Sequence, residues 1–162
     1  MLKVHGGKLE EALLREALQA SRETLGDKHP DTLKSINHFG DLLQAQGKLE
    51  EAEPLYREAL QARRETLGDK HRSTLISMSN LGALLKVQGA LEEAAPLLRE
   101  ALQASRETLG DKHPFTLLSI NHLSSLLQDQ GKLEEAAPLQ REALQVLRET
   151  LGDKHPDTLI SI

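Results

Sequence analysis

The chain has 162 residues, of which 28% are charged and only 2% are aromatic, and its formal net charge is −5. This negative balance argues against a nucleic-acid-binding protein, whose surface would be basic, and gives no electrostatic reason to bind an anionic membrane. The sequence has no cysteine, which excludes disulfides and thiolate metal sites. It also lacks the apolar run of about 20 residues that crosses a bilayer and the apolar segment of a secretory signal, so we expect a cytoplasmic location.

The first predicted element is a partial repeat at residues 1–25. From Gly7 it reads GKLEEALLREALQASRET, which is a shortened copy of three later segments. The letters before it, LKVHG, resemble LKVQG at residues 85–89, so we expect the chain to open with the end of one helix and to continue in a second. This second helix is one or two residues shorter than its copies, which should shift its apolar stripe.

Three full repeats follow at residues 26–67, 68–109 and 110–151, and residues 152–162 would start another. Each begins with the letters GDKH, which recur every 42 residues. A fixed period of about 20–50 residues is typical of solenoids, in which each repeat buries its apolar face only against its neighbours. Leucine and alanine dominate the apolar positions, which favours helices over strands. The repeats therefore predict one all-α domain over residues 1–162.

Each repeat contains the pattern of two helices. In the first full repeat, one helix is expected at about 31–46, where apolar residues recur at helical spacing. Pro30 suits the start of this helix, since its missing N–H is not needed there, and Gly47 would end the helix with a positive φ. The second helix is expected at about 49–67 and would be closed by Gly68. Short connections make such neighbouring helices antiparallel.

These motifs resemble the tetratricopeptide repeat, specifically the 42-residue variety found in kinesin light chains and nephrocystin-type proteins. The resemblance covers essentially the whole chain, and the matching residues of one repeat are Asn80, Leu81, Gly82, Leu85, Gly89, Ala94, Leu98 and Ala101. It implies a right-handed superhelical solenoid of antiparallel helix pairs. Two departures fall in the third repeat, where Ser124 replaces a glycine and Gln140 replaces a bulky apolar residue. We therefore expect that repeat to pack most loosely.

The resemblance also implies a non-catalytic interaction module, part of a scaffold or adaptor, that binds a peptide or protein segment in a concave groove lined by the first helix of each repeat. In agreement, most differences between the repeats fall on the side of these helices opposite the apolar stripe. A solvated face that nothing restrains would show the same pattern. The predicted groove residues are Lys34, Asn37, His38, Asp41, Ile76, Ser79, Asn80, Ala83, Lys86, Leu118, Asn121, His122 and Ser125.

Three kinds of side chain in this set indicate how a peptide would be held. The asparagines both donate and accept hydrogen bonds, as a peptide backbone requires, and the two lysines can hold a carboxylate. Ile76 and Leu118 make the groove partly apolar. Only Asn80 occupies a position used by the family's clamp for a C-terminal carboxylate, so we do not expect such a clamp.

Seven histidines raise the question of a metal site. Four of them, His29, His71, His113 and His155, occupy the same loop in successive repeats. Neighbouring repeats are about 10 Å or more apart, whereas zinc ligands lie about 2 Å from the ion. We therefore expect these histidines to cap the helices that follow them, and we expect no metal or other cofactor. Serine, histidine and aspartate recur at repeat positions and form no single constellation, so we expect no enzyme activity.

A second hypothesis is a structural, self-associating solenoid, either a natural fragment of a longer array or an engineered repeat protein. Solenoids need polar caps on their terminal repeats, and the sequence shows none. Complementary uncapped ends would stack head to tail and propagate as a filament. Under this hypothesis the partner is a second copy of the chain.

Overall fold

The computed structural model describes the backbone of residues 2–152 and the side chains of residues 6–152. Over this range the chain is all α-helical, as predicted, and contains no strand. The helices are α1 (Leu2–Leu25), α2 (Pro30–Ala45), α3 (Leu49–Leu67), α4 (Arg72–Val87), α5 (Leu91–Leu109), α6 (Pro114–Asp129) and α7 (Leu133–Leu151). The predicted helices at 31–46 and 49–67 correspond to α2 and α3. The helix expected to begin a further repeat after Gly152 lies outside the described residues.

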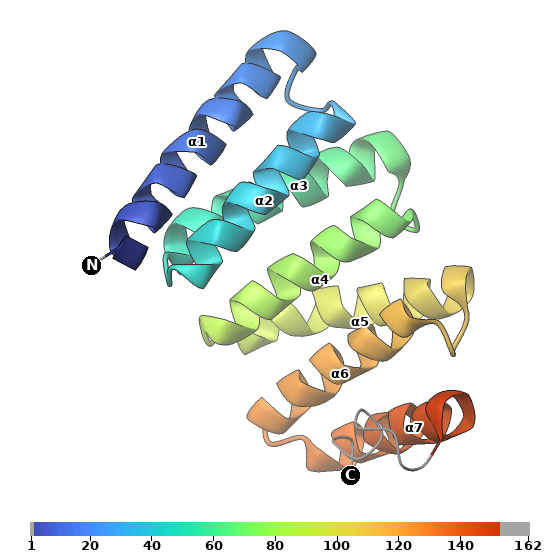
Figure 1. The fold of residues 1–162 in the computed structure, drawn as a ribbon. Helices are drawn as coiled ribbons and strands as arrows, with labels where there is room; N and C mark the ends of the chain where they lie inside the picture. Colours follow the sequence, from blue (N-terminus) through green and yellow to red (C-terminus); the bar gives the residue numbers. More distant parts are fainter. Residues whose placement is uncertain (1, 153–162) are drawn as a thin grey trace. The chain divides into compact units, whose positions relative to one another are not determined.

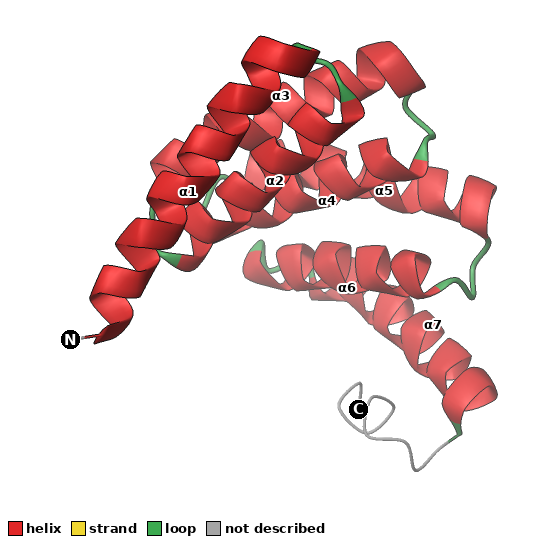
Figure 2. Cartoon of the chain, turned by 45° about the horizontal axis from the view of Figure 1, so that its top comes forward, coloured by secondary structure: helices red, strands yellow, loops and turns green. Residues whose placement is uncertain are grey.

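The chain divides within α4 into two compact units, residues 1–84 and 85–162, which we call unit 1 and unit 2. In unit 1, α1 packs on α2 and α2 packs on α3 (Figure 1). In unit 2, α5 packs on α6 and α6 packs on α7. Figure 2 shows the short loops that join these helices, so that neighbours within each unit run in opposite directions.

A histidine caps the first helix of each full repeat. The Nδ1 atom of His29 accepts a hydrogen bond of 3.1 Å from the backbone N–H of Asp31 at the start of α2. His71 and His113 accept the equivalent bonds, also of 3.1 Å, at the starts of α4 and α6. These bonds satisfy amide groups that the start of a helix leaves unpaired. The capping role predicted for these histidines is confirmed, while His155 lies outside the described residues.

A glycine with a positive φ ends both helices of the first full repeat, as predicted. Gly47 follows α2 with a φ of 77°, and Gly68 follows α3 with a φ of 86°. After α2, the N–H of Lys48 donates to the carbonyl of Leu43 at 2.8 Å, which pairs one of the last carbonyl groups of the helix. This arrangement stops α2 and directs the chain into α3.

The apolar stripe of α2 packs against α3 in unit 1. Leu33, Ile36 and Leu43 are at most 2% exposed. The closest approach is at Gly40, where an added Cβ atom would lie 2.8 Å from Cε1 of Tyr56. Tyr56 is itself 1% exposed, so its ring occupies the space that a side chain at position 40 would need. The contact between α2 and α3 therefore depends on a glycine.

The third repeat lacks this contact. Ser124 of α6 stands at the glycine position and is buried, while Gln140 of α7 is exposed at the position where Tyr56 is buried. The Oγ atom of Ser124 has no hydrogen-bond partner among the described residues. Three residues of α7 are buried, against six in α3 and six in α5. Since α7 is also the last helix that the structure describes and packs mainly on α6, the looser packing expected for this repeat stays a prediction.

The start of the chain differs from the sequence-based expectation. α1 is one continuous helix that includes Gly6 and Gly7, so the chain does not open with the end of a separate helix. Leu9 and Leu13 are 63% and 57% exposed, while Leu18 is buried, as is its counterpart Leu60; the displaced apolar stripe expected for this element stays a prediction.

Candidate functional site

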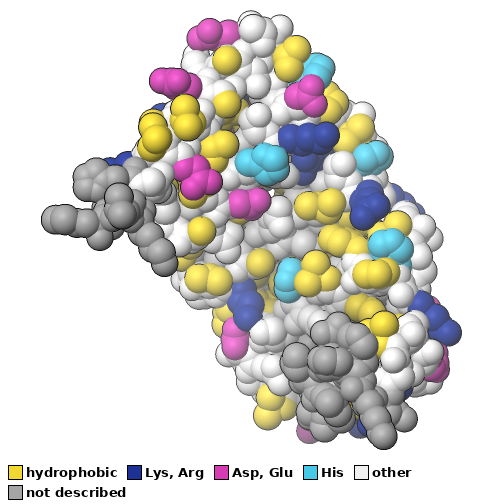
Figure 3. Space-filling model, in the orientation of Figure 1, with side chains coloured by type: hydrophobic (Ala, Val, Ile, Leu, Met, Phe, Trp, Pro, Cys, Tyr) yellow, Lys and Arg dark blue, Asp and Glu magenta, His cyan; other side chains and the backbone are white. Residues whose placement is uncertain are grey.

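The predicted groove residues of unit 1 lie on α2 and α4. Six of them are exposed or partly exposed, namely Lys34, His38, Asp41, Ile76, Asn80 and Ala83. Figure 3 shows basic, acidic and histidine side chains mixed with hydrophobic ones over these helices. Asn37 and Ser79 are only 8% and 2% exposed, which corrects the expectation that both side chains project freely into a groove. A pattern along one helix does not reveal what the neighbouring helices cover.

A buried arginine explains the position of Asn37. Arg63 of α3 is 7% exposed, and its Nη1 and Nη2 atoms donate to Oδ1 of Asn37 at 2.6 and 3.1 Å, with the amide oriented by this network. Nη1 also donates to Oγ of Ser77 at 2.7 Å and to the carbonyl of Ser73 at 3.2 Å. Burial lowers the pKa of Arg63. This guanidinium therefore joins α2, α3 and α4 within unit 1.

Asp41 is held by a buried tyrosine. The O–H group of Tyr56 lies 2.5 Å from Oδ1 of Asp41 and 3.1 Å from Oε1 of Gln44. Burial, and then the hydrogen bond to Asp41, raise the pKa of the Tyr56 phenol above its ordinary range. The negative charge of Asp41 is therefore fixed on α2.

In unit 2 the predicted residues lie on α6 and on the last turn of α4. Leu118 is 43% exposed, and Asn121 is exposed. The ammonium group of Lys86 donates to Oγ of Ser125 at 2.5 Å and lies 3.5 Å from Oδ2 of Asp129. Lys86 is therefore already neutralised in part, and the surface around it is less basic than the sequence alone indicates.

His122 also lies beside Lys86. It is partly buried, and its Nδ1 atom has no hydrogen-bond partner among the described residues. Burial, and then the charge of Lys86, lower the pKa of the imidazole below its ordinary value of 6.5. The neutral form of His122 is therefore favoured more than in a free histidine, and its Nδ1 atom is buried without a partner among the described residues.

Several of the predicted groove residues have polar groups that no other described residue binds. Four predicted groove residues have no hydrogen-bond or ion-pair partner in the part of the chain that the structure describes, namely Lys34, His38, Asn80 and Asn121. On the second helices, charged side chains pair across repeats. Arg22 of α1 binds Glu58 of α3 at 2.5 and 2.8 Å, and Arg106 of α5 binds Glu142 of α7 at 2.6 Å. Exposed side chains without a partner in the described part of the chain also occur on the second helices, for example Glu50 of α3 and Arg141 of α7.

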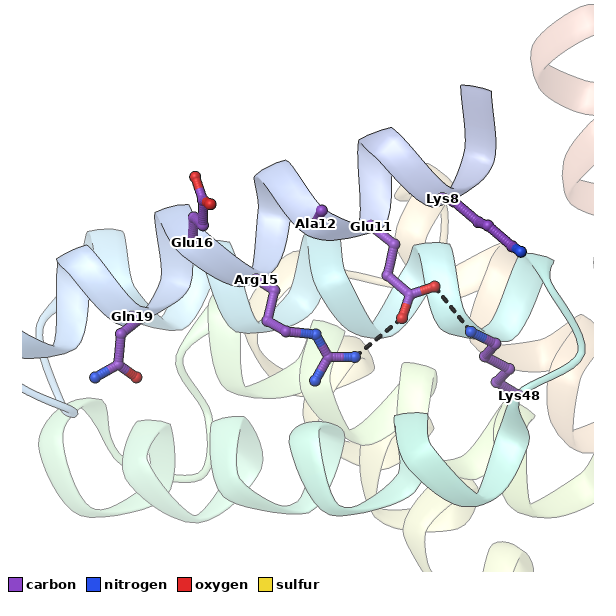
Figure 4. A pocket seen from close by; sticks show the side chains of 7 residues that line it. All are labelled: Lys8, Glu11, Ala12, Arg15, Glu16, Gln19 and Lys48. Atoms are coloured by element: carbon purple, nitrogen blue, oxygen red, sulfur yellow. Dashed lines mark hydrogen bonds and ion pairs between the residues drawn. The ribbon is translucent and has the colours of Figure 1, made fainter. Parts of the chain in front are cut away.

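Two surface hollows, of about 630 and 640 Å³, contain none of the predicted groove residues. The first lies along α1 (Figure 4) and is lined by Lys8, Glu11, Ala12, Arg15, Glu16, Gln19 and Lys48. There Glu11 accepts hydrogen bonds from Arg15 at 2.9 Å and Lys48 at 2.8 Å. The bond from Lys48, and then that from Arg15, hold the pKa of Glu11 below its ordinary value. The second hollow lies in unit 2 between α5 and α7, over Leu123 and Leu127.

Among the described residues, no group of three or more histidines, aspartates and glutamates lies close enough together to hold a metal ion. None of the described helices combines the length and apolarity that spanning a bilayer requires. The groups that are present are amides, ammonium groups and imidazoles, which form hydrogen bonds with peptide groups and carboxylates.

Sequence reasoning missed Arg63, although the sequence contains a signal for it. The equivalent positions in the other repeats are Ser21, Ser105 and Leu147, so Arg63 is the one charged residue at this place in the repeat. A comparison restricted to the first helices does not include it. The same comparison extended to the second helices identifies it at once.

Profiles of the tetratricopeptide repeat match residues 11–65, 35–107 and 116–157 of the chain. A crystal structure of nearly identical repeats of this kind from Podosopora anserina, in a protein provisionally described as a kinesin light chain, has a TM-score of 0.86 and 28% sequence identity. A variant of it has a TM-score of 0.88 and 26% identity, and in both cases the alignment covers 98% of this chain and 75% of the other. BtubC from P. vanneervenii resembles the fold with a TM-score of 0.77 and 24% identity, over 96% of this chain and 62% of the other. No curated protein matches the sequence.

Proposed function

Because the chain belongs to the tetratricopeptide-repeat family, whose members generally mediate protein–protein interactions, we propose that it is a non-catalytic module that binds an extended segment of a partner protein. The contacts would be made by the first helices of the repeats, through α2 and α4 in unit 1 and through α6 in unit 2. Such a module would serve as part of a scaffold or adaptor. We also propose a cytoplasmic location, which imaging of a fluorescently tagged chain would test.

One observation carries this proposal, namely the unsatisfied polar groups on the first helices. Asn80 and Asn121 are accessible and have no partner in the described part of the chain. An asparagine amide offers two donors and an acceptor, which matches the alternating N–H and C=O groups of an extended peptide. On the second helices, Arg22 and Arg106 are paired with glutamates of neighbouring repeats, and the exposed amides of Gln61 and Gln103 donate to Glu65 and Glu107.

Apolar side chains on the same helices would contribute a second kind of contact. Leu118 is 43% exposed beside Asn121 on α6, and Ile76 is partly exposed near Asn80 on α4. Burying an apolar side chain of a ligand against them would add affinity in proportion to the area removed from water. We therefore expect the bound segment to combine free backbone groups with one or two apolar side chains.

The test begins with selection of binding peptides from a displayed random library, followed by affinity measurements by fluorescence anisotropy. Asn80→Ala and Asn121→Ala are each expected to weaken a selected peptide by about 2- to 10-fold, because one hydrogen bond contributes about 0.5–1.5 kcal/mol. Gln61→Ala and Gln103→Ala are matched controls, since they remove exposed amides from the second helices α3 and α5. Affinity that falls with the glutamine variants and not with the asparagine variants would move the binding surface to the second helices.

A second candidate function is head-to-tail self-association. It is supported by the exposed apolar side chains of Leu9 and Leu13 on α1 and of Leu133 on α7. A second copy of the chain would cover such residues and remove them from water. Light scattering behind size exclusion should then show a mass that rises with concentration, and Leu13→Gln should reduce the rise. A constant monomer mass at high concentration would contradict this candidate.

A further inference from the structure

A hollow lies between α5 and α7, the second helices of unit 2, and none of the predicted groove residues lines it. Leu102 of α5 and Leu123 and Leu127 of α6 form its floor, where they are at most 4% exposed. Pro138 and Leu139 line it from α7 and are at least partly exposed. Its volume of about 640 Å³ lies within the range of about 300–1,000 Å³ that is usual for ligand sites. The hollow therefore has an apolar surface and room for a side chain of another protein.

Two ion pairs join α5 to α7 beside this apolar floor. Nη2 of Arg99 lies 2.9 Å from Oε2 of Glu135, and Nη2 of Arg106 lies 2.6 Å from Oε2 of Glu142. Arg99 lines the hollow, and its side chain is 48% exposed. A guanidinium group that solvent can reach therefore stands at the edge of the floor.

Unit 1 shows which group lies next to the corresponding guanidinium. Two repeat periods earlier in the chain, Arg15 corresponds to Arg99 and Phe39 corresponds to Leu123. Cζ of Arg15 lies 4.9 Å from the centroid of the Phe39 ring, and Phe39 is 4% exposed. A cation at this distance is attracted by the negative charge on the face of the ring. An aromatic ring therefore packs against the arginine in unit 1, whereas the shorter leucine stands at this position in unit 2.

The ion pair of Arg99 does not prevent contact with a ring. Arg15 forms an ion pair with Glu11 at 2.9 Å while its guanidinium lies over Phe39. A guanidinium is planar, so its edge can donate to a carboxylate while its face packs on an aromatic group. The sequence of unit 2 contains one aromatic residue, Phe115 at the start of α6, and it does not line the hollow. The ring that would complete this contact must therefore come from another molecule.

We propose that the hollow between α5 and α7 binds an aromatic side chain of a partner protein, with the ring on the leucine floor and against the guanidinium of Arg99. Charge complementarity favours an aromatic occupant, because the guanidinium is positive and the face of a ring is negative. The apolar floor adds affinity by removing the ring from water. This inference goes beyond the proposed function, since the hollow and the predicted groove share no residue.

The experiment titrates two blocked amino acids, N-acetylphenylalanine amide and N-acetylcyclohexylalanine amide, into the isotope-labelled full chain and follows the NMR spectrum. The cyclohexyl ring has a similar shape but lacks the negative face. The phenylalanine probe should shift the side-chain amide of Gln103, which lines the hollow, and the methyl groups of Leu123 and Leu127. The side-chain amides of Gln61, the counterpart of Gln103 one repeat earlier, and of Asn121 should not shift.

Two variants test the role of each part of the hollow. Leu123→Phe installs the residue that the first full repeat has at this position, so its own ring should occupy the place beside Arg99 and the shifts should be lost. Arg99→Met keeps a long apolar side chain and removes the charge. It should weaken the phenylalanine probe by about two- to fivefold and leave the affinity for the cyclohexyl probe unchanged. Circular dichroism checks that both variants are folded, and Arg99→Met tests the proposal even if Leu123→Phe does not fold.

The proposal is supported if the shifts at Gln103 disappear in folded Leu123→Phe and if Arg99→Met weakens only the aromatic probe. It is wrong if the phenylalanine probe leaves Gln103 and both leucines unshifted, or if it binds folded Leu123→Phe as tightly as the wild type. An equal effect of Arg99→Met on the two probes would also overturn it, because the guanidinium would then not recognise the ring. None of these outcomes depends on peptide binding by Asn80 and Asn121, so the proposed function is tested separately.

Discussion

The contact between Gly40 and Tyr56 leads to a prediction about stability that can be worked out from the structure. In Gly40→Ala the new Cβ atom would lie 2.8 Å from Cε1 and 3.1 Å from Cζ of the Tyr56 ring. The ring is 1% exposed and its hydroxyl is bound to Asp41 at 2.5 Å, so the ring has no free direction in which to move. Either α2 moves away from α3, or the tyrosine loses its hydrogen bond.

Three terms set the change in the free energy of unfolding. Alanine is favoured over glycine inside a helix by about 1 kcal/mol, whereas forcing extra volume into a packed contact costs about 1–3 kcal/mol. Loss of the Tyr56 hydrogen bond adds about 1 kcal/mol. We therefore expect a net destabilisation of about 1–3 kcal/mol. For a chain of this size that lowers Tm by roughly 2–12 °C.

The assay is thermal unfolding followed by circular dichroism at 222 nm. The matched control is Gly40→Ala in a Tyr56→Leu background, because Leu98 is the counterpart of Tyr56 in the next repeat. In that background the clash is removed, and the alanine should be neutral or stabilising. The reasoning would be refuted by a Gly40→Ala chain as stable as the wild type, or by an equal loss of stability in the two backgrounds.

Three further predictions concern ionisation and ion pairs. Tyr56 is the only tyrosine in the chain, and burial together with Asp41 raises its pKa above the ordinary value of 10. The absorbance near 295 nm should therefore remain that of a neutral phenol in folded protein above about pH 10, and the free energy of unfolding should begin to fall there. Tyrosinate absorbance in folded protein near pH 10 would contradict this. The pKa of His122 is lowered below 6.5 by burial and then by Lys86. Its contribution to stability should therefore be present above about pH 6.5 and lost as the pH falls. NMR titration should place the midpoint of this imidazole below that of a free histidine, and His122→Gln should remove this part of the pH dependence; an unchanged pH profile in the variant would count against it. Glu142→Gln should lower the free energy of unfolding by less than about 1 kcal/mol, because Arg106 and Glu142 are each about one-third exposed. Urea unfolding should show a smaller loss of stability at high salt. A loss that does not depend on salt would contradict a screened ion pair.

The repeat period and the ends of the helices could be predicted from the sequence. Pro30 and Gly47 indicate a first helix at 31–46, and α2 runs over Pro30–Ala45. These helix boundaries could be predicted because the features that begin and end the helices are local. They are a proline in the first turn, a capping histidine and a glycine with a positive φ. The helix pair recurs with the period of 42 residues, so evidence from one repeat supports the others.

The start of α1 could not be predicted in the same way. Gly6 resembles Gly89 in its sequence context, yet Gly6 lies inside α1 while Gly89 has a φ of 80°. A glycine permits the end of a helix but does not impose one. At Gly47 the end is stabilised by the bond from the N–H of Lys48 to the carbonyl of Leu43, which requires a complete helix before the glycine.

The exposure of the candidate groove residues could be predicted only in part, for a different physical reason. The exposed positions of Lys34 and His38 follow from the face of a single helix, which periodicity describes well. The burial of Asn37 does not follow from the face of a single helix. It depends on Arg63, which lies 26 residues further along the chain on another helix. Contacts between helices require the packing to be known, and the sequence signals them only through residues that break the repeat, as Arg63 does.

The central claim is that the first helices of the repeats bind a peptide, and its most direct test is the NMR spectrum of the side-chain amides. A peptide selected from the library would be titrated into ¹⁵N-labelled protein. The account predicts that the side-chain resonances of Asn80 and Asn121 shift on binding, while those of Gln61 and Gln103 on the second helices do not. Shifts confined to Gln61 and Gln103 would contradict the account, because they would place the peptide on α3 and α5.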